Sequence, residues 1–444
     1  MQGNIDFANT PVVDAVNKIL VDSARAGASD IHFDHSDNYL KVRIRIDGIL
    51  NDYIDIPNNI KNNVITRIKI LSGMNITETR LPQDGAIKTT LEGLDLDMRV
   101  SSLPTKKGEK IVIRILDYSR SLQGIEYLFF SEDNYKKILK MLGDPNGIIL
   151  ITGATGSGKS TTVYSFLQKL NVKGTNLITV EDPVEMDIEG INQVQVNSEI
   201  GLDFATVLRS ILRQDPNVIM IGEIRDSETA QIAVRASITG HLVLSTLHTN
   251  NSLTTIERLL DMDVERYLLA SALSGIVSQK LARKLCDKCK TTRQTTSYEK
   301  EMFRRFLNMN VDTIYEPVGC PECSGGYKGR IAIQEVLLIS PDIRDAINAR
   351  MSKAELRNLV YNSDVITLLQ DGLYKALAGF TSIEEIIKLT EADDEVNAET
   401  KYKDLNKQNT NQNINSTPLN NTNISTTPTT ITSAIANTNT NNII

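Results

Sequence analysis

The stretch that decides the fold is Gly153-Ala154-Thr155-Gly156-Ser157-Gly158-Lys159-Ser160. It fits the phosphate-binding pattern G-x-x-x-x-G-K-[ST] at each of its fixed positions. The pattern of apolar residues predicts a buried strand over 147–152 that leads into the stretch and a helix over 161–170 that leaves it. Glycines let backbone N–H groups face a phosphate, and the N-terminus of the helix adds partial positive charge. The stretch therefore predicts a binding site for a nucleoside triphosphate.

Individual positions of this loop have predicted parts in binding. Lys159 is expected to reach the β- and γ-phosphates, and the Ser160 hydroxyl is expected to bind Mg²⁺. The alternative is a glycine-rich turn that matches by chance, which the predicted strand and helix on either side disfavour. The predicted nucleotide contacts are Gly153, Thr155, Gly156, Ser157, Gly158, Lys159, Ser160 and Thr161.

The composition indicates a soluble cytoplasmic protein of two or three domains. The chain has 444 residues and a formal net charge of −7, which argues against a basic nucleic-acid-binding protein. We find no apolar run of about 18 residues for a membrane span and no N-terminal secretion signal. All four cysteines lie between residues 286 and 323, unlike a secreted disulfide framework. Peripheral attachment to a membrane complex remains compatible with these features.

Sequence patterns divide the chain into five predicted segments. Residues 1–120 alternate a helix with short strand-like runs, which indicates an α+β domain. Residues 121–283 alternate strands with helices, which is typical of a parallel sheet. Residues 284–330 hold the cysteines, and residues 331–394 are predicted to be helical. Residues 395–444 are rich in Asn and Thr, and we expect them to be disordered because they offer little apolar surface to bury.

Two acidic segments follow apolar strands downstream of the loop. Residues 177–185 include Glu181 and Glu185, and residues 217–223 end at Glu223. The C-terminal ends of parallel strands line the ligand crevice, so these carboxylates are expected to face the phosphates. Glu223 is expected to help hold Mg²⁺, and Glu185 or Glu181 to polarise the attacking water. The spacing does not decide how Glu185 and Glu223 share these roles, and either carboxylate alone also fits a solvated strand end or a helix cap.

Two arginines and a histidine complete the predicted catalytic set. Arg209 and Arg213 lie four residues apart, so a helix presents them on one face. They would stabilise transition-state charge, in the same or a neighbouring subunit, or form only a solvated basic face. His248 lies at the C-terminal end of a predicted strand, where it would donate a hydrogen bond to the γ-phosphate. His241, at the opposite end, fits a structural histidine equally well.

The cysteines form two knuckles, Cys286-x-x-Cys289 and Cys320-x-x-Cys323. Four thiolates at this spacing fit a closed tetrahedral Zn²⁺ site, and no coordination position is left open for catalysis. The alternative is a set of reduced thiols without metal. Direct contact with nucleic acid is disfavoured because interleaved aromatic and basic residues do not flank the insert.

These motifs resemble, in kind and in order, those of the secretion ATPase superfamily that drives type II secretion and type IV pilus assembly. The resemblance covers about residues 10–392. It rests on an acidic box (180–185), an atypical Walker B motif (219–226), a histidine box (239–250) and the N-terminal segments 28–33, 45–48, 80–85 and 108–110. The chain departs from the family pattern at Ala86, where an Arg is frequent, and at Gln334, where an aromatic or apolar residue is more usual.

The resemblance implies an α/β fold with a RecA-like P-loop ATPase core. An α+β (PAS-like) domain would precede that core, and a small zinc-binding insert and C-terminal helices would follow it. Glu185 is then the catalytic carboxylate and Glu223 the Walker B acid.

The resemblance also assigns the arginines. Arg209 and Arg213 match arginines that reach toward nucleotide phosphates. Arg99 and Arg114 match arginines that close over the nucleotide when the N-terminal domain swings in.

The function that the resemblance implies is a hexameric motor at the cytoplasmic face of the inner membrane. It would hydrolyse ATP with Mg²⁺, contain Zn²⁺, and power pilus assembly or type II secretion through an inner-membrane platform protein and a cytoplasmic adaptor. The cysteine module resembles the assembly or secretion branch, because retraction motors generally lack it. The alternatives are a retraction motor and a nucleic-acid translocase with the same core. A nucleotide-gated scaffold without turnover is disfavoured by the complete catalytic set.

Overall fold

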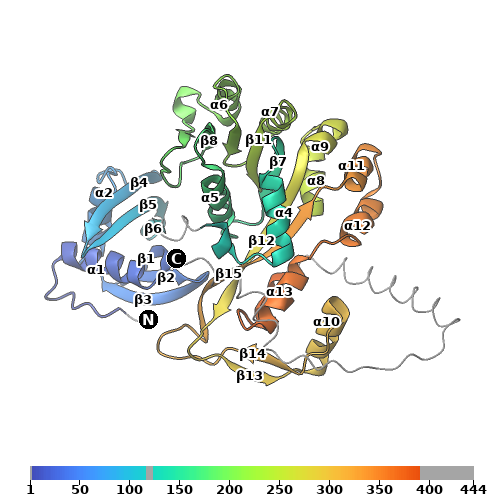
Figure 1. Cartoon of the computed structure of the whole chain (residues 1–444). Coiled ribbons are helices and arrows are strands. Elements are labelled where there is room, and N and C mark those ends of the chain that lie inside the picture. Colours follow the sequence, from blue (N-terminus) through green and yellow to red (C-terminus); the bar gives the residue numbers. More distant parts are fainter. Residues whose placement is uncertain (1–2, 117–123, 391–444) are drawn as a thin grey trace. The chain divides into compact units, whose positions relative to one another are not determined.

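The computed structural model describes residues 3–116 and 124–390, and the chain divides into two compact units, residues 1–119 and 120–444 (Figure 1). The predicted disordered tail, residues 395–444, lies outside the described residues. Within the described ranges, no helix is long and apolar enough to cross a bilayer.

The first unit is a six-stranded antiparallel sheet whose strands follow the order β3-β2-β1-β6-β5-β4. Along β2, Leu40, Val42 and Ile44 are buried and the residues between them are partly exposed, because successive side chains of a strand point to opposite faces. The buried face packs against two helices. The elements of this unit are α1 (Val12–Arg25), β1 (Ala28–His35), β2 (Tyr39–Ile46), β3 (Ile49–Pro57), α2 (Lys61–Leu71), β4 (Gln83–Leu91), β5 (Leu94–Thr105) and β6 (Gly108–Leu116).

The second unit has a seven-stranded sheet of order β15-β12-β7-β11-β10-β8-β9. All neighbours pair in parallel except β15, which is antiparallel to β12. The predicted parallel α/β core is therefore confirmed. Its elements up to the last parallel strand are η1 (Ile125–Leu128), α4 (Glu132–Leu142), β7 (Gly147–Thr152), α5 (Lys159–Leu170), β8 (Leu177–Glu181), β9 (Asn192–Gln195), η2 (Ser198–Ile200), α6 (Phe204–Ile211), β10 (Val218–Ile221), α7 (Ser227–Ile238), β11 (Leu242–Leu247), α8 (Ser252–Asp261), α9 (Arg266–Ala272) and β12 (Leu273–Leu285).

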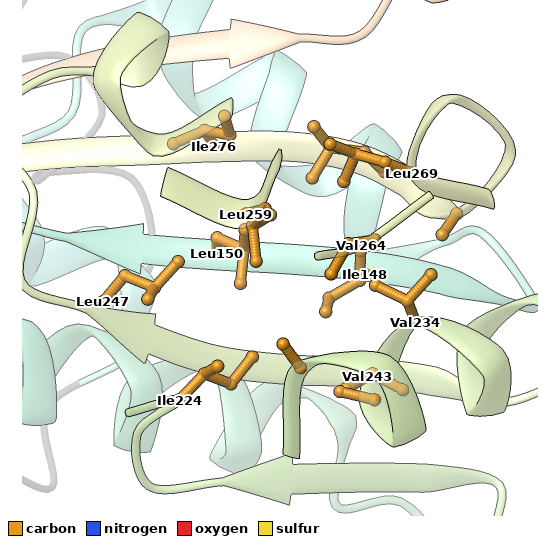
Figure 2. Packing of buried hydrophobic residues seen from close by; sticks show 14 of the residues in the cluster. Ile148, Leu150, Ile224, Val234, Val243, Leu247, Leu259, Val264, Leu269 and Ile276 are labelled. Carbon is orange, nitrogen blue, oxygen red and sulfur yellow. The ribbon is translucent and has the colours of Figure 1, made fainter. Parts of the chain in front are cut away.

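Helices cover both faces of this sheet. Figure 2 shows Ile148 and Leu150 of β7 and Val243 of β11 packed with side chains of the helices on one face. The opposite face of β7 and β11 packs against α5. All residues of β7, β10 and β11 are buried, as expected for central strands of a sheet that is covered on both sides. This rigid core fixes the strand ends that carry the candidate site.

Strands β12 and β15 extend beyond the nucleotide-binding core toward the cysteines. β12 runs directly into Cys286, and β15 returns shortly after Cys323. The region expected to be helical from residue 331 thus begins as strand, because residues 331–338 pair with β12 as part of β15. The remaining elements are β13 (Thr291–Gln294), α10 (Ser297–Leu307), β14 (Thr313–Glu316), β15 (Tyr327–Leu338), α11 (Pro341–Asn348), α12 (Lys353–Tyr361) and α13 (Leu368–Leu377), and residues 383–390 are also helical.

Candidate active site

The phosphate loop leaves the buried strand β7 and enters α5 through three glycines with positive φ. The φ angles of Gly153, Gly156 and Gly158 are +148°, +80° and +89°, which L-residues with a side chain rarely adopt. A Cβ on Gly153 would lie 2.4 Å from the carbonyl oxygen of Gln279 on β12. The loop can therefore hold this shape only with glycine where the neighbouring strand passes beneath it.

Lys159, the first residue of α5, folds back over the loop. Its ammonium donates hydrogen bonds to the carbonyl oxygens of Gly153, at 2.8 Å, and of Ala154, at 3.2 Å. Burial lowers the pKa of Lys159, and the carboxylate of Glu223 opposes that shift. The exposed Ser160 follows directly. The loop thus carries a cation and a hydroxyl at the start of a helix, where an anion is favoured.

Glu223 follows β10 and contacts Arg225 of the same segment and His248 from the end of the neighbouring strand. Its carboxylate accepts a hydrogen bond from Arg225 at 2.6 Å and lies 3.4 Å from Nε2 of His248, which follows β11. The hydrogen bond from Arg225 is the main reason that the pKa of Glu223 is lowered. Arg225 also lies 3.6 Å from Asp182, directly after β8. Three neighbouring strand ends therefore meet: Arg225 links the ends of β8 and β10, and Glu223 links the end of β10 to that of β11.

Glu181 has a different environment from the other acidic residues. It is 3% exposed and accepts hydrogen bonds from Tyr164, from Thr179 at 2.6 Å and from Gln193 at 3.1 Å. The Tyr164 hydroxyl in turn accepts the backbone N–H of Glu185 at 3.2 Å. Burial, reinforced by Glu181, raises the pKa of Tyr164, so its hydroxyl stays protonated. The arrangement makes Glu181 and Tyr164 a support for the segment that bears Glu185.

Removal of the Tyr164 hydroxyl should destabilise this support. We expect Tyr164→Phe to lower the free energy of unfolding by about 1–3 kcal/mol, because a buried carboxylate loses a donor. Denaturant unfolding measures the change. Tyr267→Phe, at an exposed position of α9, is the matched control and should leave unfolding unchanged. Equal unfolding curves for Tyr164→Phe and the unmutated protein would contradict the assignment.

The other residues predicted for the site have contacts elsewhere in the second unit. Arg209 is exposed on α6 and pairs with Glu228 of α7, whereas Arg213 donates to the Arg209 carbonyl at 2.8 Å. His241 precedes β11, and its Nδ1 lies 2.9 Å from the carbonyl of Ala236, which fits the structural alternative. The structure thus brings Glu223 close to His248 and to Lys159. Arg209 lies on α6 and Arg213 lies two residues beyond the end of that helix, so one helix does not present both, and both are exposed within this chain.

Arg99 and Arg114 belong to the first unit. They lie directly opposite each other on β5 and β6, so their side chains share one face of that sheet. Arg114 pairs with Asp30 of β1 at 3.1 Å. The two arginines therefore form a basic pair on the sheet of the first unit.

The four cysteines converge at the ends of β12 and β15. All four sulfur atoms lie within 4.8 Å of one another. Cys286 and Cys320 are 3.9 Å apart, Cys289 and Cys323 are 3.7 Å apart, and Cys320 and Cys323 are 3.6 Å apart, measured between Sγ atoms. Zn–S bonds of about 2.3 Å in a tetrahedron require sulfur–sulfur edges of about 3.8 Å. The cluster therefore fits a metal ion with four thiolate ligands.

Comparison with known proteins places this architecture in a family. The profile of the family described as "Type II/IV secretion system protein" matches residues 7–388. The chain is 43% identical over 397 residues to the putative type II secretion system protein E of Escherichia coli K12, which covers 88% of this chain and 80% of that protein. It is 44% identical over 385 residues to the type IV pilus assembly ATPase PilB of Pseudomonas aeruginosa, covering 86% of this chain and 68% of that protein.

Solved structures share the fold at low sequence identity. The ATPase DotB of Legionella pneumophila superposes with a TM-score of 0.64 at 20% identity over 87% of this chain and 98% of that chain. The pilus retraction motor PilT with bound ADP gives a TM-score of 0.57 at 24% identity over 84% of this chain and 96% of that chain. With the family profile matched along most of its length, this chain belongs to the type II/IV secretion system protein family.

Proposed function

We propose that this protein hydrolyses ATP to power type IV pilus assembly or type II protein secretion. The observation that carries the proposal is the meeting of Glu223 and His248 at the ends of neighbouring strands, close enough to the phosphate-loop Lys159 for Glu223 to affect its pKa. Phosphoryl transfer requires cations for the developing charge, a carboxylate near the metal and a group that orients water. The chain offers each of these groups.

Each residue of the site has a proposed role. Lys159 would bind the β- and γ-phosphates, and His248 would donate a hydrogen bond to the γ-phosphate. Glu185 would orient and polarise the attacking water, since Glu181 is engaged with Tyr164. Mg²⁺, when bound, would be held by Ser160 and Glu223 and would neutralise charge on the phosphates. The lowered pKa of Glu223 supports this, because a metal ligand must be deprotonated.

Four arginines outside the phosphate loop and the strand ends are proposed to act on the nucleotide. Arg209 and Arg213 are exposed, which supports a role toward the nucleotide of a neighbouring subunit in a hexamer. For Arg99 and Arg114 the proposal rests on the family resemblance. Such charge stabilisation is typical of arginines in phosphoryl transfer.

The proposed motor works as a hexamer at the cytoplasmic face of the inner membrane. The names of the relatives, type II secretion system protein E and type IV pilus assembly ATPase, support a part in such a machine, while the hexamer and its place at the membrane rest on the family resemblance. The partners would be an integral-membrane platform protein and a cytoplasmic adaptor. Hydrolysis would change the orientation of domains, and the ring would transmit the change as force.

The experiment that tests this proposal is steady-state ATPase activity with and without the cytoplasmic domain of a candidate platform protein. Stimulation by that domain is the expected result and identifies the machine. Stimulation by DNA or RNA instead, with indifference to the platform domain, would overturn the proposal in favour of a translocase.

We also expect the cysteine cluster to hold one Zn²⁺ per chain. A structural Zn²⁺ site contributes folding free energy directly, so chelation should lower the melting temperature. Elemental analysis gives the metal content, and thermal unfolding with and without chelator gives the effect. Cys320→Ser should reproduce the loss of metal, whereas Ser324→Ala beside the knuckle should not. Full metal content in Cys320→Ser would contradict a four-thiolate site.

A further inference from the structure

A buried glutamine on β12 holds the phosphate loop from beneath. Gln279 is 1% exposed, and its Nε2 donates a hydrogen bond to the carbonyl oxygen of Ser157 at 2.8 Å. Its Oε1 accepts a hydrogen bond from the Thr162 hydroxyl on α5 at 2.8 Å. A carbonyl oxygen can only accept, so the amide nitrogen must face Ser157 and the amide oxygen must face Thr162. Both ends of the amide are therefore used, in one orientation.

The bond to Ser157 acts on the peptide group that follows it. In a trans peptide the C=O and the next N–H point in opposite directions. When Gln279 holds the Ser157 carbonyl toward β12, the N–H of Gly158 must point away from β12. A phosphate loop binds its anion through N–H groups that face inward, while its carbonyls face outward. The hydrogen bond from Gln279 to the Ser157 carbonyl thus orients the N–H of Gly158 as a donor to phosphate.

We propose that Gln279 is a positioning residue for nucleotide binding, which sets the Ser157–Gly158 peptide group and ties it to the first turns of α5. The inference rests on the proposed nucleotide site and extends it to a residue on another strand. Gln279 touches the loop and the helix, and it acts on the phosphate only through them. The amide of Gln279 is suited to this positioning role because it donates to the phosphate loop and accepts from α5.

The partner strand offers a matched control. Gln334 lies directly opposite Gln279 in the pairing of β12 with β15, and it is also buried. Its Nε2 donates to the carbonyl of Leu128 at 2.9 Å, and its Oε1 accepts from Lys375 at 3.1 Å. The replacement Gln334→Leu removes a buried amide from the same sheet layer without removing a bond to the phosphate loop. This variant therefore shows how much nucleotide affinity is lost through lower stability alone, without loss of the bond that positions the phosphate loop.

The experiment is equilibrium binding of ADP with a fluorescent ribose label, together with thermal unfolding of each variant. We expect Gln279→Leu to weaken binding by about tenfold and Gln334→Leu to keep it within about twofold while its melting temperature falls. Unchanged affinity in Gln279→Leu, or an equal loss in Gln334→Leu, would overturn the inference. If the unmutated protein does not bind the labelled ADP, that result would instead contradict the proposed function itself.

A second variant, Gln279→Glu, should give a pH-dependent affinity, which a general loss of stability would not produce. In Gln279→Glu, an ionised carboxylate would repel the Ser157 carbonyl, whereas a protonated carboxyl donates to it as the amide does. Burial favours the protonated form. The charged groups bonded to the loop and to Gln334, namely Lys159 and the Asp371–Lys375 pair, are shared with the unmutated protein.

The affinity of Gln279→Glu, relative to that of the unmutated protein, should therefore recover as the pH falls from about 8 to about 6. Gln279→Leu should show no recovery, and a flat ratio for Gln279→Glu would contradict the inference. If Gln279→Glu does not fold, Thr162→Val decides. Its loss of affinity should vanish in a Gln279→Leu background, and additive losses would contradict the inference.

Discussion

Lys159→Ala should reduce ATP hydrolysis by at least about 100-fold, because the phosphates lose the cation that the loop supplies. The ammonium lies directly over the loop, bonded to the carbonyls of Gly153 and Ala154. Steady-state phosphate release from the purified variant measures the effect. Nucleotide binding should weaken as well, since the cation contacts the phosphates in the bound ground state.

The control for this variant lies in the same helix. Lys169 is in the last turn of α5 and is exposed, so Lys169→Ala makes the same chemical change away from the loop. Its turnover should match that of the unmutated protein. Normal turnover in Lys159→Ala would remove the basis for assigning the nucleotide site.

Glu185→Gln should keep ATP binding and reduce hydrolysis by about 100-fold or more, because the amide cannot accept a proton from the attacking water. The variant retains the size of the side chain and the backbone N–H that donates to Tyr164. Binding of labelled nucleotide and phosphate release, measured on one preparation, separate the two effects.

Comparison with two further variants assigns the role. Glu189→Gln, at an exposed position of the same segment, should have no effect on either quantity. Glu223→Gln should raise the Mg²⁺ concentration needed for half-maximal hydrolysis, because it replaces a proposed carboxylate metal ligand by a neutral amide. Undiminished hydrolysis in Glu185→Gln would shift the water-polarising role to Glu223 or Glu181.

The parts of the site that were predictable from sequence follow rules of local spacing. The loop 153–160, the strand before it and the helix after it were all expected, because glycine and lysine positions and apolar periodicity are read along the chain. The same holds for the two cysteine knuckles, whose sulfurs do converge.

Contacts between distant segments were not predictable in this way. Gln279 lies on β12, more than a hundred residues after the loop that it holds, and no motif marks it. The contacts of Arg225 depend on the ends of β8 and β10, which come together only in the folded sheet. The pairing of Arg209 with Glu228 likewise depends on the packing of α6 against α7. Contacts of this kind depend on the tertiary arrangement of the strands and helices. The periodicity of apolar residues and the spacing of motif residues along the chain do not give that arrangement.

One measurement tests the central claim most directly, namely ATP turnover by the unmutated protein with its mass determined by light scattering in the same preparation. The account predicts Mg²⁺-dependent release of phosphate from a species with the mass of six chains. Protein that remains a monomer and releases no phosphate at saturating ATP and Mg²⁺ would contradict it.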